Sequence, residues 1–184
     1  MDKSRITNTL QDIGHAAFLW NRIQECWFLI FTGLLKNESR PVVEAIFKQF
    51  DSDRAQRELV VAVANASLEK NDAHRLKIVH LIAKTNNESG HRNSIIHAQF
   101  HIVTTNPTSA DYDLRVGRNS ASKRKNKLEF KQLKVELPAF LERLKALDQE
   151  VEYLRNDMSE NPNQIQTGSL SEMLANILRQ EGAD

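Results

Sequence analysis

Apolar side chains form a regular stripe along the first part of the chain. With one gap at Thr9, the stripe advances by alternating steps of three and four residues through Ile6, Ile13, Ala16, Trp20, Ile23, Trp27, Ile30 and Leu34. This spacing places its members on one face of a helix, so we predict a long helix over residues 6–36. Phe28, Phe31 and Leu35 widen the stripe, which predicts that the later half is buried on more than one side.

Three shorter helical segments follow this first helix. The segment "PVVEAIFKQF" predicts a short helix that opens on Pro41, because proline fits the first helical turn. The segment "DRAQRELVVAVANASLEK" predicts a third helix, with Asp51 or Asp53 as its N-cap. A fourth helix is expected from Ala73 onwards, capped by Asn71 or Asp72.

The fourth segment carries apolar residues that we expect to define its buried side. Leu76, Val79 and Ala83 share one direction on a helix, and we place Ile78 and Ile82 close to that direction. The segment should therefore bury one broad apolar face.

The periodicity changes at residue 100. The stretches "FHIVTT" and "YDLRVG" are rich in β-forming residues, and "NPTSA" between them is typical of a turn, so we predict a small β-hairpin. A helix over residues 129–157 follows, with Pro138 predicting a kink or a late helix start. Its stripe consists of Leu133, Leu137, Phe140, Leu144, Leu147, Val151 and Leu154.

These elements predict an all-α fold, a helical bundle with a small β-hairpin inserted before the last long helix. We assign residues 1–157 to one bundle domain, and residues 158–184 to a linker and a short amphipathic C-terminal helix. The two long heptad-like stripes suit an intramolecular core and a dimer interface equally well.

Charge is balanced over the whole chain but not along it. The 184 residues have a net charge of +1, yet residues 115–134 hold eight Lys or Arg against one Glu. Such a basic run is either a solvated loop or a contact for RNA phosphates. The candidate RNA-binding residues are Arg115, Arg118, Lys123, Arg124, Lys125 and Lys127.

The cysteine content and the apolar runs indicate a cellular compartment. Cys26 is the single cysteine, so the chain forms no internal disulfide, which suits a reducing compartment. The first twenty residues lack the apolar core of a signal peptide, and the run "CWFLIF" is too short to span a membrane. We therefore expect a cytoplasmic protein without membrane contact.

The stretch "GHRNSIIHAQF" places polar side chains in an apolar helical pattern. Asn93 and His97 are one helical turn apart, whereas Arg92 lies about 140° from His97 on an ideal helix. The long Arg92 side chain could still reach His97. If the three meet, imidazole, guanidinium and amide together suit RNA cleavage by its own 2′-hydroxyl without a metal. The alternative is a polar helix end with structural hydrogen bonds.

The spacing of arginine and histidine is weak evidence by itself. The chain repeats it in "RLKIVH", from Arg75 to His80, within an ordinary amphipathic pattern. His91, His97 and His101 lack the spacing and the acidic or cysteine partners of a metal site, so we predict no metal and no cofactor.

The segment "RNSIIH" resembles the R-N-x-x-x-H motif of the HEPN superfamily (higher eukaryotes and prokaryotes nucleotide-binding domains). The order of elements over roughly residues 10–155 is also similar. The resemblance implies an all-α homodimer, with Arg92, Asn93 and His97 as candidate catalytic residues of a metal-independent endoribonuclease. It further implies RNA as substrate, and a role in RNA processing or in toxin–antitoxin defence with an antitoxin partner. Other members are non-catalytic dimerisation or sensing modules, which remains the alternative for this chain.

Overall fold

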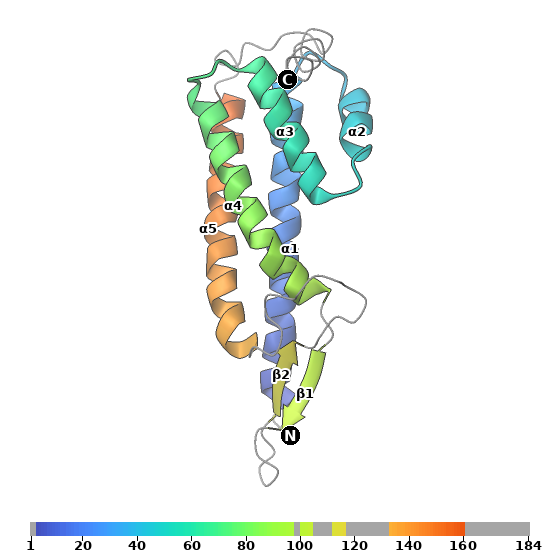
Figure 1. Ribbon diagram of the computed structural model, residues 1–184, viewed down its shortest axis with the longest axis vertical. Coiled ribbons are helices and arrows are strands. Elements are labelled where there is room, and N and C mark those ends of the chain that lie inside the picture. The colour runs from blue at the N-terminus through green and yellow to red at the C-terminus, as the bar shows by residue number, and fades with distance from the viewer. Residues whose placement is uncertain (1–2, 98–99, 105–111, 117–132, 161–184) are drawn as a thin grey trace, which may run out of the picture. The chain divides into compact units, whose positions relative to one another are not determined.

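The computed structural model describes residues 3–97, 100–104, 112–116 and 133–160. These residues form helices and one two-stranded antiparallel hairpin, as the sequence predicts for an all-α fold (Figure 1). The elements are α1 (Lys3–Leu34), α2 (Arg40–Lys48), α3 (Asp53–Ser67), α4 (Ala73–Ile96), β1 (Phe100–Thr104), β2 (Tyr112–Val116) and α5 (Leu133–Glu160).

The predicted stripes of α1 and α5 are the buried faces of these helices. All seven members of the α5 stripe are buried, and so are the α1 members from Ala16 onwards, while Ile6 and Ile13 are half-buried. Phe31 and Leu35 are also buried, which confirms that the later half of α1 is covered on more than one side. Pro138 lies within α5, so the helix starts before the proline and continues through it.

The starts of the middle helices follow local chemistry. Pro41 occupies the first turn of α2, as predicted. The N-cap of α3 is Ser52, whose hydroxyl accepts from the amide of Ala55 at 3.2 Å. The prediction of Asp51 or Asp53 was wrong by one residue, because Asp53 already belongs to the first turn. Asp72 does cap α4, since its carboxylate accepts from the amide of Arg75 at 3.0 Å.

The predicted buried face of α4 was wrong for part of its members. Leu76 and Val79 are 58% and 42% exposed, whereas Ile78 and Ile82 are buried. The cause is geometric: at about 100° per residue, Ile78 lies about 200° from Leu76, so the two cannot share a face. The helix buries the side of Ile78, Leu81 and Ile82.

The hairpin has a simple register. Phe100 pairs with Val116, His101 with Arg115, and Thr104 with Tyr112 at the other end. Leu114 and Val116 are buried, while His101 is exposed. Because successive side chains of a strand alternate between faces, the hairpin presents one apolar and one polar side.

The chain divides into two compact units, and each long helix contributes to both. Unit 1 contains residues 1–21 and 86–148, and therefore the hairpin and the C-terminal end of α4. Unit 2 contains residues 22–85 and 149–184, and its described part includes α2 and α3. In its core the buried rings of Phe31 and Phe47 pack together, with their centroids 5.2 Å apart.

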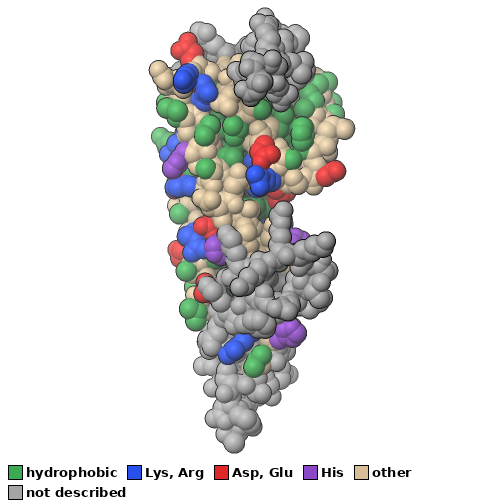
Figure 2. Space-filling model, in the orientation of Figure 1, with side chains coloured by type: hydrophobic (Ala, Val, Ile, Leu, Met, Phe, Trp, Pro, Cys, Tyr) green, Lys and Arg blue, Asp and Glu red, His purple; other side chains and the backbone are tan. Residues whose placement is uncertain are grey.

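The surface carries charges of both signs. On the face drawn in Figure 2, basic, acidic and histidine side chains of the described residues are mixed with apolar ones. Among the helices that the structure describes, none is long and apolar enough to cross a membrane. The predicted C-terminal helix and most of the preceding linker lie outside the described residues, apart from residues 158–160, which belong to α5.

Candidate functional site

The candidate catalytic residues lie where α4 ends. Arg92 and Asn93 belong to its last turns, and His97 follows the final helical residue, Ile96. The His97 amide still donates to the Asn93 carbonyl at 3.1 Å. Ile95 is fully buried and anchors this end, while Asn93 and His97 are exposed. Burial of Ile95 on one side of this turn therefore leaves Asn93 and His97 on the solvent-exposed side.

The Arg92 guanidinium joins the three candidate residues. Its Nη1 donates to the Asn93 side-chain oxygen at 2.9 Å and lies 3.3 Å from His97 Nε2. An arginine nitrogen can only donate, so the contact requires a lone pair on His97 Nε2. A neutral imidazole with its proton on Nδ1 satisfies this requirement. The contact forms although ideal helical spacing separates the two residues by about 140°.

The ring of Trp20 supports the same guanidinium from α1. The Arg92 Cζ atom lies 5.7 Å from the ring centroid of Trp20, which is buried at 1% exposure. A cation above an indole face is attracted by the ring quadrupole. Trp20 therefore contributes to the core, as the sequence predicts, and also restricts where the Arg92 charge can lie.

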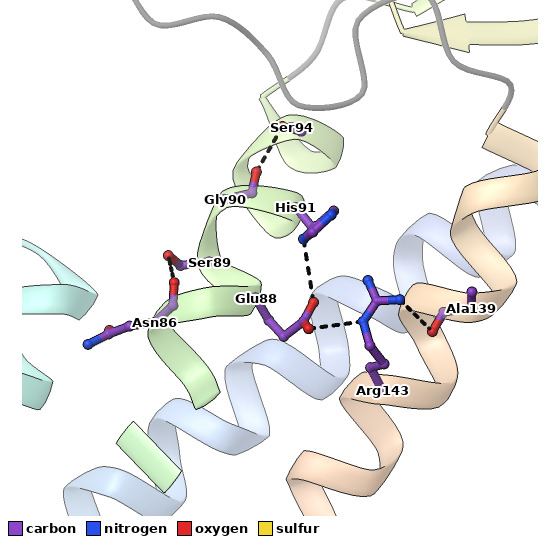
Figure 3. Close-up of polar contacts among 8 residues, drawn as sticks. All are labelled: Asn86, Glu88, Ser89, Gly90, His91, Ser94, Ala139 and Arg143. Carbon is purple, nitrogen blue, oxygen red and sulfur yellow. Dashed lines mark hydrogen bonds and ion pairs between the residues drawn. The ribbon is translucent and has the colours of Figure 1, made fainter. Parts of the chain in front are cut away.

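A second polar cluster, centred on Glu88, lies one helical turn before Arg92 in α4. Figure 3 shows the Glu88 carboxylate between His91 of α4 and Arg143 of α5. Glu88 Oε1 accepts from Arg143 Nε at 2.9 Å, and Oε2 lies 3.6 Å from His91 Nδ1. The Glu88 side chain is only 17% exposed, so this pair is screened less than a surface pair.

Phe140 of α5 lies beside both basic partners of Glu88. The imidazole of His91 lies 6.0 Å from the Phe140 ring, and the guanidinium of Arg143 lies 5.8 Å from it. Arg143 also donates to the Ala139 carbonyl at 3.3 Å. The cluster of Glu88, His91, Phe140 and Arg143 therefore ties the end of α4 to the first half of α5.

The sequence predicts Arg92, Asn93 and His97 as site residues, but it does not predict the contact with Trp20 or the cluster around Glu88. The i,i+3 spacing of Glu88 and His91 is a usable local signal for their ion pair. Glu88 and Arg143 are 55 residues apart, and no local pattern links them. The position of Trp20 in the apolar stripe predicts that it is buried, but it does not predict that the Arg92 guanidinium lies above its ring.

The predicted RNA-binding residues are only partly described. Arg115 lies on β2 and is half-buried, opposite His101 on β1. Arg118, Lys123, Arg124, Lys125 and Lys127 lie outside the described residues. The sequence predicts no metal site at His91, His97 and His101. Within the described ranges, no three His, Cys, Asp or Glu side chains gather closely enough to hold a metal ion.

The other copy of the Arg–His spacing, Arg75 and His80, behaves differently. Arg75 Nε donates to Asn65 of α3 at 2.7 Å, and His80 is exposed. Both residues lie inside α4, where the spacing keeps them on different sides.

The chain was also compared with known proteins. No protein-family model matches it, and neither the curated proteins nor the solved structures contain a significant match.

Proposed function

We propose that the protein is a homodimeric, HEPN-type endoribonuclease that needs no metal, with Arg92 and His97 as its catalytic pair. The observation that carries the proposal is the 3.3 Å contact between Arg92 Nη1 and the Nε2 atom of the exposed His97. A guanidinium and an imidazole that share one surface position can bind a phosphate and move a proton at the same place.

The reaction assigned to this pair is attack of an RNA 2′-hydroxyl on the adjacent phosphorus. The incoming phosphate draws the Arg92 guanidinium from His97, which leaves the Nε2 lone pair available. His97 Nε2 then accepts the 2′-hydroxyl proton, the O2′–P bond forms, and the P–O5′ bond breaks. The 5′-oxygen takes a proton from water, and the products are a 2′,3′-cyclic phosphate and a 5′-hydroxyl.

Arg92 is suited to stabilise the extra negative charge of the transition state. Its guanidinium stays charged at every relevant pH, and its planar fork matches phosphate oxygens. Trp20 and the Asn93 side chain restrict the position of this group before substrate binds. Such preorganisation is what makes an electrostatic contact effective in catalysis.

The decisive experiment is cleavage of a mixed-sequence RNA in EDTA. The purified wild-type protein is compared with His97→Ala and Arg92→Ala. We expect only the wild type to cut and to leave 2′,3′-cyclic phosphate ends. Equal cutting by all three proteins would identify a contaminant or another site and would refute the assignment.

The homodimer in this proposal has a candidate surface in unit 1. Leu10 and Phe18 of α1 are exposed by more than half, and a Cβ added at Gly14 between them would meet open space. Exposed large apolar side chains on one helix suit contact with a second copy. We expect the wild type to sediment as a dimer and Phe18→Glu as a monomer. The control is Phe50→Glu, at an exposed position after the end of α2. A monomeric wild type would remove the dimer from the proposal.

A second candidate function is a non-catalytic dimerisation or sensing module with the same fold. The observation that favours it is that Arg92 Nη1 is engaged by Asn93 and His97 of its own chain, while Arg92 Nε is buried. This arrangement also describes a helix end held by its own hydrogen bonds. Absence of RNA cleavage by a folded wild type would favour this function.

A further inference from the structure

The hairpin brings together a histidine and an arginine that are distant in the sequence. His101 of β1 and Arg115 of β2 are direct partners in the antiparallel register. Directly opposite residues place their side chains on the same face, with Cβ atoms about 4.5–5.5 Å apart. His101 is exposed and Arg115 is half-buried, so this pair occupies the polar side of the hairpin.

We propose that His101 and Arg115 form a second phosphate-binding position, which holds the RNA strand beside the Arg92–His97 site. This inference rests on the proposed function, because it assigns a role in binding the same substrate. Two basic side chains directly opposite each other on a sheet repel when both are charged. A phosphate can accept from both side chains at once and offsets any repulsion between them.

The position of the hairpin makes one continuous RNA contact feasible. Both the hairpin and the end of α4 belong to unit 1. His101 is four residues after His97, so their Cα atoms are at most about 14 Å apart. This limit on the separation is compatible with one strand contacting both positions.

The pair also changes the meaning of the basic run in the sequence. That run begins with Arg115, and the register adds His101 from the other strand. The resulting position has two donors for one phosphate, which an isolated basic residue on a loop lacks. It binds the RNA backbone and carries no preference for particular bases.

The test measures RNA binding without cleavage. A single-stranded RNA with 2′-O-methyl groups in place of its 2′-hydroxyls is titrated against the full-length wild type at several salt concentrations. His101→Gln, Arg115→Gln and the double variant are compared with His15→Gln on α1, a matched exposed histidine in the same unit. Circular dichroism confirms that every variant is folded.

We expect the double variant, which loses this one phosphate contact, to reduce the slope of log K against log salt by about 0.7, and each single variant to reduce it by no more than that. His101→Lys should retain binding. His101→Glu should weaken binding further, although its opposite charge suits the hairpin by pairing with Arg115. Slopes equal to that of His15→Gln would overturn the inference.

The outcomes separate this inference from the proposed function. If native RNA is cut as proposed but the hairpin variants bind like the wild type, the inference fails alone. If the hairpin variants lose binding but the wild type does not cut RNA, the binding position stands and the catalytic proposal fails. A wild type that binds no RNA overturns both.

Discussion

Helix α4 contains the same Arg–His spacing twice, and the two copies have different fates. In the first, Arg75 turns to Asn65 of α3, at 2.7 Å, and the exposed His80 lies elsewhere on the helix surface. In the second, Arg92 Nη1 reaches His97 Nε2 at 3.3 Å. The comparison teaches that spacing alone does not make a site.

The position of each copy in the helix explains the difference. Arg75 lies in the first turn of α4 and His80 follows within the same helix, so about 140° of helical rotation separates them. His97 follows the last helical residue, its amide still donates to the Asn93 carbonyl, and the Arg92 side chain spans the distance to its ring. The second arginine also meets the ring of Trp20. The end of the helix and a neighbouring aromatic ring together bring the pair into contact.

The largest expected effect is on cleavage by the two copies. Removing the general base in His97→Ala should lower the cleavage rate by about 10²–10⁴-fold. Arg75→Ala and His80→Ala should leave the cleavage rate within about twofold of the wild type. In this proposal Arg75 and His80 do not contact the transition state, so their removal should not raise its free energy. Rates are measured under single-turnover conditions with excess protein. A similar loss from His80→Ala would end the distinction between the copies.

The next effect concerns the support of Arg92 by Trp20. Trp20→Leu removes the cation–π contact, which is worth about 0.5–2 kcal/mol, so the cleavage rate should fall by up to about thirtyfold. Trp20→Phe keeps an aromatic face and should retain most of the rate. Trp27→Leu serves as the control, because Trp27 is equally buried but belongs to unit 2.

Thermal melts separate this effect from a loss of stability. Both Leu variants should melt at a lower temperature, since each removes buried aromatic volume. Only Trp20→Leu should lose rate at a temperature where both are folded. An equal loss of rate in Trp27→Leu would show that Trp20 acts only through the core.

A smaller effect is expected for the tie between α4 and α5. Arg143→Met removes the partner of the mostly buried Glu88 carboxylate and should lower the free energy of unfolding by about 1–3 kcal/mol. Arg54→Met breaks the exposed Arg54–Glu58 pair in α3 and should change the free energy of unfolding by less than about 1 kcal/mol. Urea unfolding curves measure both. Equal shifts would mean that the Glu88 cluster is only a surface pair.

The smallest effect is the pH dependence of an exposed pair in α2. The hydrogen bond and the positive charge of Lys48 lower the pKa of Glu44 below its usual 4.5. A lowered pKa in the folded state stabilises the fold above the ordinary value, and this contribution is lost as pH falls through the lowered value. Melting curves of wild type and Glu44→Gln should therefore differ slightly at pH 7 and converge in acid. A difference that grows in acid would contradict this sign.

Much of the fold follows from the sequence, but little of the site does. The seven-residue stripe of α5 is buried as predicted, and Asp72 caps α4. The cap of α3 was misplaced by one residue, because serine and aspartate cap helices about equally well and the sequence offers both. The sequence also named Arg92, Asn93 and His97, but the side-chain contacts between them depend on where α4 ends.

The sequence by itself determined the helices, the buried stripes of α1 and α5 and the hairpin, because periodicity and capping act between residues a few positions apart. Only the tertiary structure decided which polar groups meet. Glu88 finds Arg143 across 55 residues, and Arg92 finds the ring of Trp20 on another helix. These contacts depend on the packing of helices distant in the chain, and no local pattern encodes that packing. The same packing places Arg75 beside Asn65 of α3 and Arg92 beside Trp20 of α1.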